Sequence, residues 1–436
     1  MKHIRNAMII WGCIWGFFVS ASLAQPVNTP KTGTLFQKTA SILETIQTMQ
    51  DSTLTGDIPI EVVSSIEMYP AKARFVLSHV LPEGLPEEGR LLKKLGAIPQ
   101  EYNYEQGMVE LYLEPLEAYY HYQQGVLYVP NWKTPIEQEF AISRSAGVAV
   151  QDQVIQLENY LKPSTTPNAD LGLARSAVIN GKAMGFAISY QMGGEGRTFV
   201  DIPSVFNTAR EMLLEPRLET LEFQNAPPFV QEVYLFPYTY GTVFLSHIAN
   251  RIGWENLDIV YVEPPASTEH ILHPNTYLDL TNLAYRDEPD SIFIPNLTAD
   301  LLRSWSLVHS MVMGEFRTFL LLNQYDRAKA RAAAEGWEGD RVMLYQNPYN
   351  DELLIYLSKW ESHLDTRQFY YAYRNVIEAK YPDAELVEST ATSLTWQKEG
   401  LYIYLMRYKF YVLILEGVPE NLLKPVSSEV MPVKFR

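Results

Sequence analysis

Cysteine is nearly absent from this sequence of 436 residues, since Cys13 is the only one and lies in an apolar run near the N-terminus. If that run is removed on export, the remaining chain has no thiol. This excludes disulfides, a thiol nucleophile and cysteine-ligated metal sites. The chain must then be held together by its hydrophobic core. With 47% hydrophobic and 12% aromatic residues it is long and apolar enough to form one.

Long hydrophobic runs are also scarce. Residues 1–24 begin with Lys2 and Arg5, continue with apolar residues and end in the small-residue site Ser22-Leu23-Ala24. This order predicts a secretory signal peptide, and hence a periplasmic or extracellular protein without an integral membrane segment after cleavage. Retention of the uncleaved run as a membrane anchor is the alternative.

Basic residues are also fewer than acidic ones. The sequence has 35 Lys and Arg and 51 Asp and Glu, which gives a net charge of −16. Loss of Lys2 and Arg5 with the signal makes it −18. Such a surface argues against nucleic acid and anionic lipid as partners and favours a basic one. The GxSxG elbow and the GxxxxGK[ST] phosphate loop are missing as well, so the common hydrolase-nucleophile and nucleotide signals are absent.

Composition and patterning divide the chain into a linker at 25–40, a first domain at 41–288 and a C-terminal α+β domain at 289–436. In the last part, Leu301 to Leu322 and Gln324 to Glu335 read as helical. The following segments predict a strand, strand, helix, strand, strand order, typical of a small antiparallel sheet with a helix: Leu353 to Ser358 with Trp360, Thr366 to Lys380, Ser393 to Gln397, Leu401 to Arg407 and Lys409 to Glu416.

The first domain is organised around residues 134–162, which predict one long helix. Thr134-Pro135-Ile136-Glu137 is a capping-box start, and apolar residues then recur mostly at three- to four-residue steps. A second helix is predicted at 168–192. It is apolar around most of its circumference, and Gly181 and Gly185 would allow the first helix to approach closely.

Within the first helix, Ala149-Val150-Gln151-Asp152-Gln153 resembles the end of the motif HExxHALQDQ, found in a family of secreted bacterial zincin-like metallopeptidases. Further along, residues 264–274, PPASTEHILHP, resemble the PPxSTExxLHP signature of the same family. The resemblance implies an α+β fold with a zincin-like helical core and a small sheet, followed by a smaller α+β domain.

The zinc ligands of that family are replaced. In an active zincin two His one turn apart hold Zn²⁺, and the Glu beside the first polarises a bound water. By the resemblance these positions are Arg144, Ser145 and Val148, and the third ligand falls at Asn180. Guanidinium repels a cation, a serine hydroxyl is no base near neutral pH, valine has no lone pair, and an amide replaces a carboxylate poorly on zinc.

Two features leave alternatives open. Residues 118–129 predict a hairpin, which in the resembled family forms a wall of the cleft and binds extended peptides. In PPASTEHILHP, Ser267 or Thr268 can cap a short helix, or Glu269, His270 and His273 can form a relocated metal site. Arg144 in turn can bind a peptide carboxylate in the cleft or neutralise an internal carboxylate.

The sequence therefore favours an exported, non-catalytic pseudopeptidase without a cofactor, in which Arg144-Ser145-Ala146-Gly147-Val148 replaces HExxH. Such a protein would bind an unidentified protein or peptide. An active zinc metallopeptidase or other hydrolase with a metal at Glu269, His270 and His273 is the alternative, and a structural role in an assembly is the third hypothesis.

Overall fold

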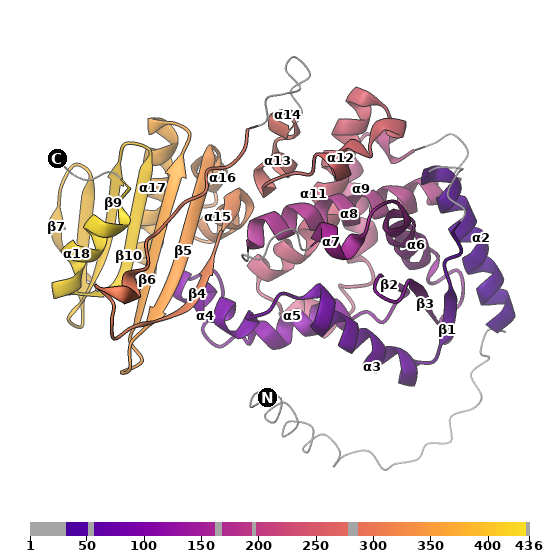
Figure 1. Ribbon diagram of the computed structural model, residues 1–436, viewed down its shortest axis with the longest axis horizontal. Coiled ribbons are helices and arrows are strands. Elements are labelled where there is room, and N and C mark those ends of the chain that lie inside the picture. The colour runs from indigo at the N-terminus through magenta and orange to yellow at the C-terminus, as the bar shows by residue number, and fades with distance from the viewer. Residues whose placement is uncertain (1–31, 51–55, 162–167, 194–197, 278–286, 433–436) are drawn as a thin grey trace, which may run out of the picture.

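A computed structural model describes residues 32–50, 56–161, 168–193, 198–277 and 287–432. Its fold is α+β, as predicted: a helical body with a three-stranded sheet precedes a domain built on a seven-stranded sheet (Figure 1). The predicted signal peptide lies outside the described residues. Among the described helices, none combines the length and apolar character needed to span a membrane.

Most of the N-terminal body is helical. Its elements are α2 (Thr32–Gln50), β1 (Ile60–Val63), α3 (Ser65–Phe75), η2 (Val76–Val80), α4 (Leu85–Leu95), α5 (Tyr104–Leu113), β2 (Tyr119–His121), β3 (Val126–Pro130), α6 (Glu139–Val154), α7 (Leu157–Leu161), α8 (Ala169–Gln191), η3 (Phe199–Asp201), α9 (Val205–Leu214), α10 (Leu221–Asn225), α11 (Pro228–Ile252), η4 (Trp254–Asn256), α12 (Ile259–Val262), α13 (Thr268–Leu272) and α14 (Pro274–Tyr277).

Helix α2 begins inside the segment predicted to be a linker. The linker was expected to reach residue 40, but the chain is helical from Thr32, and Leu35 and Thr39 are fully buried in the body. A few apolar residues at helical spacing decide this, because they find a surface to pack on that the local polar composition does not reveal.

The first predicted helix, 134–162, starts later than expected. Thr134 and Glu137 exchange the two capping-box bonds, of 2.6 and 3.3 Å, but α6 begins only at Glu139. The side chain of Gln138 explains the delay, because it donates to two carbonyl groups at and just beyond the end of β3, at 3.0 and 3.2 Å. Residues 134–138 therefore form a turn ahead of the helix.

The same predicted helix is also interrupted near its end. Ile155 is extended, with φ −131° and ψ 150°, and separates α6 from α7. The carboxylate of Asp152 accepts the Leu157 N–H at 3.0 Å and so supplies a local acceptor at the start of α7. The break thus follows from a short-range side-chain bond that competes with the helix.

The second predicted helix is confirmed as α8, where Asn168 accepts the Leu171 N–H at 3.0 Å as N-cap. Its glycines have other partners than expected. A Cβ on Gly181 would lie 2.3 Å from the backbone of Gly241 in α11, and one on Gly185 would meet Phe199. The close approach of α6 to α8 is made by Gly147 instead. Helix α8 is thus clamped between α6 and α11.

The predicted hairpin is confirmed and lies beside α6. Strands β2 and β3 pair antiparallel, with Tyr119 opposite Tyr128, and β1 pairs with β3 in parallel, giving the order β1-β3-β2. All three residues of β2 are buried. Strand β2 lies at the edge of this sheet and packs on α6, so its side chains are used in the core.

The C-terminal domain contains η5 (Leu297–Ala299), β4 (Ser306–Met311), α15 (Gly314–Asn323), α16 (Ala330–Ala334), β5 (Trp337–Gln346), β6 (Glu352–Trp360), α17 (His363–Lys380), β7 (Glu385–Ser389), β8 (Ser393–Lys398), β9 (Leu401–Tyr408), β10 (Tyr411–Pro419) and α18 (Glu420–Val430). The predicted strands at 353–358, 393–397, 401–407 and 409–416 overlap β6, β8, β9 and β10, and the predicted helix lies in α17, but β7 also follows this helix and was not predicted. The helical prediction for 301–322 was wrong in part, because β4 lies within it and pairs with β5.

The seven-stranded sheet has the order β4-β5-β6-β10-β9-β8-β7, and its central strands β6 and β10 are buried on both faces. Along β6, Leu354 and Tyr356 face the core shared with α17 and the helical body. Leu353, Ile355 and Leu357 face a second core formed with α18 and the segment that precedes β4. Double-sided burial explains why β6 reads as a continuous apolar run instead of an alternating one.

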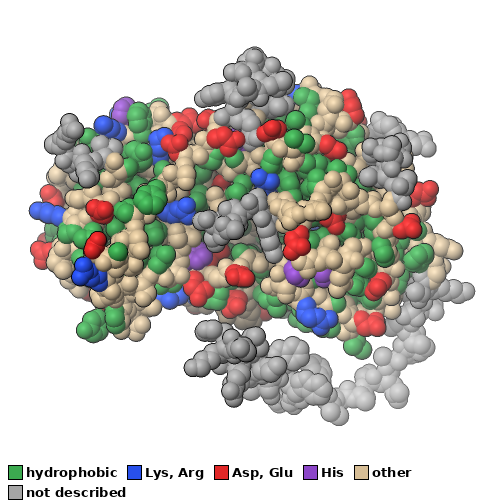
Figure 2. Space-filling view, viewed as in Figure 1, with side chains coloured by type: hydrophobic (Ala, Val, Ile, Leu, Met, Phe, Trp, Pro, Cys, Tyr) green, Lys and Arg blue, Asp and Glu red, His purple; other side chains and the backbone are tan. Residues whose placement is uncertain are grey.

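Buried and half-buried ion pairs join the two parts. Arg317 of α15 bonds Glu88 of α4 at 3.0 Å, both buried, and Arg90 bonds Glu352 of β6 at 2.7 Å. Helices α13 and α15 also pack together at this junction. On the face shown in Figure 2, acidic side chains are spread over both parts, and basic side chains are fewer and scattered.

Candidate functional site

Arg144, the residue that the resemblance matched to the first zinc ligand, forms a buried ion pair. Arg144 projects from α6, and its Nη2 lies 2.5 Å from Oε1 of Glu117, just before β2. The same carboxylate oxygen accepts a bond of 3.0 Å from Arg217, which follows α9. Arg144 therefore neutralises an internal carboxylate, which was one of its two expected roles.

The charges of Glu117, Arg144, Arg217 and Lys72 act strongly on one another. Burial by itself would raise the pKa of Glu117, but Arg217, Arg144 and Lys72 outweigh it and hold that pKa at about 2. Burial lowers the pKa of Lys72 to about 8, against the attraction of Glu117. The Lys72 ammonium donates to two backbone carbonyls, at 3.0 and 3.2 Å. One carboxylate thus balances three basic groups, and all four side chains are buried.

The side chains at the other three positions that the resemblance singled out, two matched to zinc ligands and Ser145 matched to the water-polarising Glu, bond or pack within the fold. Ser145 donates to the Ala118 carbonyl at 2.8 Å, which ties α6 to the chain entering β2. Val148 packs against the main core. The Asn180 amide donates to the carbonyl and hydroxyl of Ser176, one turn earlier on α8, at 3.0 Å each. The Ser145 hydroxyl and the Asn180 amide N–H are thus used within the fold, and Val148 has no ligand atom.

Gln151 and Asp152, which match the last part of the HExxHALQDQ motif, form hydrogen bonds to other elements of the fold. Gln151 donates to Gly147 and Ile179, at 2.9 and 3.0 Å, and so joins α6 to α8, while Tyr261 donates to its amide oxygen at 2.8 Å. Asp152 accepts the Tyr120 hydroxyl at 2.8 Å from β2. The resemblance around these residues is therefore explained by packing of the first helix.

Residues 264–274 contain the whole of α13, but the predicted cap is supplied from elsewhere. Ser267 is the N-cap residue and makes no side-chain cap bond. Asp170 of α8 accepts the Thr268 N–H at 3.0 Å and its hydroxyl at 2.5 Å. Burial raises the pKa of Asp170 to about 7, partly offset by these bonds from Thr268.

The two histidines of this segment face different partners. His270 is fully buried, and its Nδ1 accepts the Ala266 N–H at 3.1 Å. Its Nε2 lies 2.6 Å from the Asp287 carbonyl, so both ring nitrogens bond the backbone and the ring is held as one neutral tautomer. His273 Nε2 lies 2.9 Å from Oε1 of Glu315 on α15.

Glu269 is brought instead to a group of carboxylates. Its side chain, Asp287 and Glu361 offer oxygens that all lie within 4.8 Å of one another, in the part of the chain that the structure describes. Burial raises the pKa of Glu269 to about 10, with Glu315 as the next cause. The group joins three separate segments: α13, the residues after it, and the turn between β6 and α17. Sequence reasoning singled out only Glu269.

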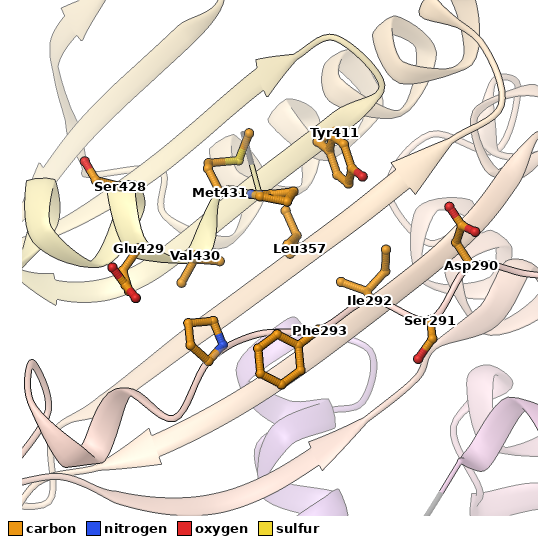
Figure 3. A pocket seen from close by; sticks show the side chains of 12 residues that line it. Asp290, Ser291, Ile292, Phe293, Leu357, Tyr411, Ser428, Glu429, Val430 and Met431 are labelled. Atoms are coloured by element: carbon orange, nitrogen blue, oxygen red, sulfur yellow. The ribbon is translucent and has the colours of Figure 1, made fainter. Parts of the chain in front are cut away.

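A cavity of about 410 Å³ lies in the C-terminal domain, far along the chain from α6 (Figure 3). It opens between residues 290–295, α18 and the sheet. Phe293 at its rim is 80% exposed. Its lining mixes apolar and polar side chains: Asp290, Ser291, Ile292, Phe293, Pro295, Leu357, Tyr411, Ser428, Glu429, Val430, Met431 and Pro432. No residue predicted for the site contributes to it.

Residues 306–425 match a family model described as a domain of unknown function (DUF8575). The match runs from β4 into α18 and so covers the sheet domain, without α6, α8 or α13. No curated protein and no solved structure matches the chain. The match covers 120 of the 436 residues and carries no information on chemistry.

Proposed function

We propose that this chain is an exported, non-catalytic protein with the scaffold of a zincin-like metallopeptidase, acting as a protein- or peptide-binding or structural module. One observation carries the proposal: where the resembled family has its first zinc histidine, Arg144 is bonded to Glu117 in the interior. The guanidinium of Arg144 repels Zn²⁺ from this position. Removal of Arg144 would leave the buried Glu117 carboxylate with Arg217 and Lys72 as its basic neighbours.

The surroundings support the same conclusion. Ser145 and Asn180 direct their polar atoms to neighbouring residues of the fold, and Val148 has no ligand atom. A metal-activated water needs ligands and a nearby base, and these four positions supply neither. The net charge of −16 favours a basic partner for a binding role.

A relocated zinc site finds less support. The ring nitrogens of His270 both bond backbone groups, and His273 is paired with Glu315. The group around Glu269 contains only carboxylates, which suit hard cations better than zinc. The geometry therefore favours the non-catalytic function over a second hydrolase centre.

The test is the zinc content of the purified protein after incubation with excess Zn²⁺ and desalting, together with hydrolysis of an unstructured protein substrate. We expect no retained zinc and no hydrolysis that a chelator abolishes. About one zinc per chain with chelator-sensitive hydrolysis would overturn the proposal. A Glu361→Gln variant measured in parallel separates metal held by the carboxylate group from metal held near Arg144.

A further inference from the structure

Three acidic side chains from distant segments converge at the junction between the helical body and the sheet domain. Glu269 lies on the short helix α13, Asp287 lies just before the segment leading to β4, and Glu361 lies in the turn after β6. We propose that these three carboxylates bind one hard divalent cation of the Ca²⁺ type.

A fourth carboxylate supports this assignment independently of the three. Glu315 is only 5% exposed, and its Oε2 has no hydrogen-bond partner among the described residues. Its Oε1 is bonded to His273, one helical turn after Glu269. Glu315 is also the charged group that acts most strongly on Glu269, so the two carboxylates lie close together. A buried carboxylate oxygen without a donor indicates a missing positive partner.

The charged groups around Glu269 also favour a bound cation. The charged groups that act most strongly on it are all acidic: Glu315, Glu361, Asp287 and Asp170. Basic side chains at this junction are engaged elsewhere, as Lys359 is with Asp290. Carboxylates gathered at a half-buried position repel one another unless a proton or a cation stands between them.

The ligands are held in place by their own bonds. His270 bonds the carbonyl of Asp287, and the Glu361 N–H donates to the Gly336 carbonyl at 2.9 Å. Glu269 is fixed by α13, whose first residue is bonded to Asp170 of α8. Such supporting bonds lower the cost of ordering ligands around an ion.

The ligand set selects the class of cation. Carboxylate oxygens without imidazole or thiolate suit Ca²⁺ and Mg²⁺, and irregular geometry with flexible ligand number suits Ca²⁺ better. Glu361 is exposed and Asp287 half-buried, so an ion can enter from solvent and keep bound waters. The ion would link the helical body to the turn between β6 and α17, and so stabilise the junction.

This proposal is independent of the non-catalytic function, because none of its ligands lies on α6 or α8. Its test is a titration with Tb³⁺, whose luminescence is excited through Trp360, the residue before Glu361. We expect saturation at one Tb³⁺ per chain, displacement by Ca²⁺, and a higher melting temperature in Ca²⁺ than in a chelator.

Two variants and one control make the test specific. Glu361→Gln, at an exposed turn, should weaken Tb³⁺ binding by about tenfold or more while leaving the circular dichroism spectrum unchanged. Asp287→Asn should do the same. Glu385→Gln, on the exposed strand β7, should bind like the unaltered protein. Absence of saturable binding, or equal affinity in Glu361→Gln, would overturn the proposal.

Discussion

Nη2 of Arg144 lies 2.5 Å from Oε1 of Glu117, and both side chains are about nine-tenths buried. Arg217 bonds the same carboxylate and Lys72 acts on it through space, so three basic groups surround one acidic group. The position matched to a zinc ligand thus holds a fixed cation, and the stability of the helical body depends on its partner.

Replacement of Arg144 by Met should destabilise the protein even though Arg217 still bonds Glu117. Loss of one partner from a buried ion pair typically costs about 3 to 5 kcal/mol. The remaining Arg217 should keep the loss near the lower value. Urea unfolding followed by circular dichroism measures it. Arg303→Met is the matched control, because the Arg303–Asp300 pair is exposed and should contribute little.

The pH dependence of stability should reveal Glu117. Its pKa of about 2 in the folded state lies below the ordinary value of 4.5, so the unfolded chain binds more protons between these limits. The contribution is therefore present above pH 4.5 and is lost as the pH falls towards 2. We expect the stability difference between the unaltered protein and Glu117→Gln to shrink over this window, by about 3 kcal/mol. A pH-independent difference would contradict the assignment.

Gly181→Ala should destabilise the contact between α8 and α11. The added Cβ would lie 2.3 Å from the backbone of Gly241, which cannot move without shifting a helix. Overpacking of this kind costs about 1 to 3 kcal/mol. Gly172→Ala on the same helix is the control, because no atom lies within 4 Å of its added Cβ, and it should be neutral or stabilising. Equal effects in thermal unfolding would refute the close packing.

Restoration of the ligands should restore zinc binding if the resemblance is correct. The variant Arg144→His, Val148→His, Asn180→Glu places two imidazoles one turn apart on α6 and a carboxylate on α8. Glu117 is kept, because it still neutralises Arg217, and the variant should retain about one zinc per chain after desalting. The same variant without Asn180→Glu should bind more weakly. A folded restored protein that retains no zinc would contradict the assigned register.

Much of the fold could be predicted because its signals are local. Asn168 as cap and the apolar pattern after it located α8, and alternation around Gln123-Gln124-Gly125 located the β2–β3 hairpin. The strand at 306–311 was missed because β4 is an edge strand with weak alternation, next to the apolar run of α15. The start of α2 was missed because its burial depends on distant helices.

The sequence by itself determined which chemistry is missing: no histidine lies between His121 and His247, so no two-histidine zinc helix can form there. Only the tertiary structure decided what replaces it. Glu117 precedes Arg144 by 27 positions, and Arg217 follows Glu117 by 100. Glu269, Asp287 and Glu361 likewise meet only when α13 docks against the sheet domain. Charges of this kind attract or repel through space, and no local pattern in the chain records their partners.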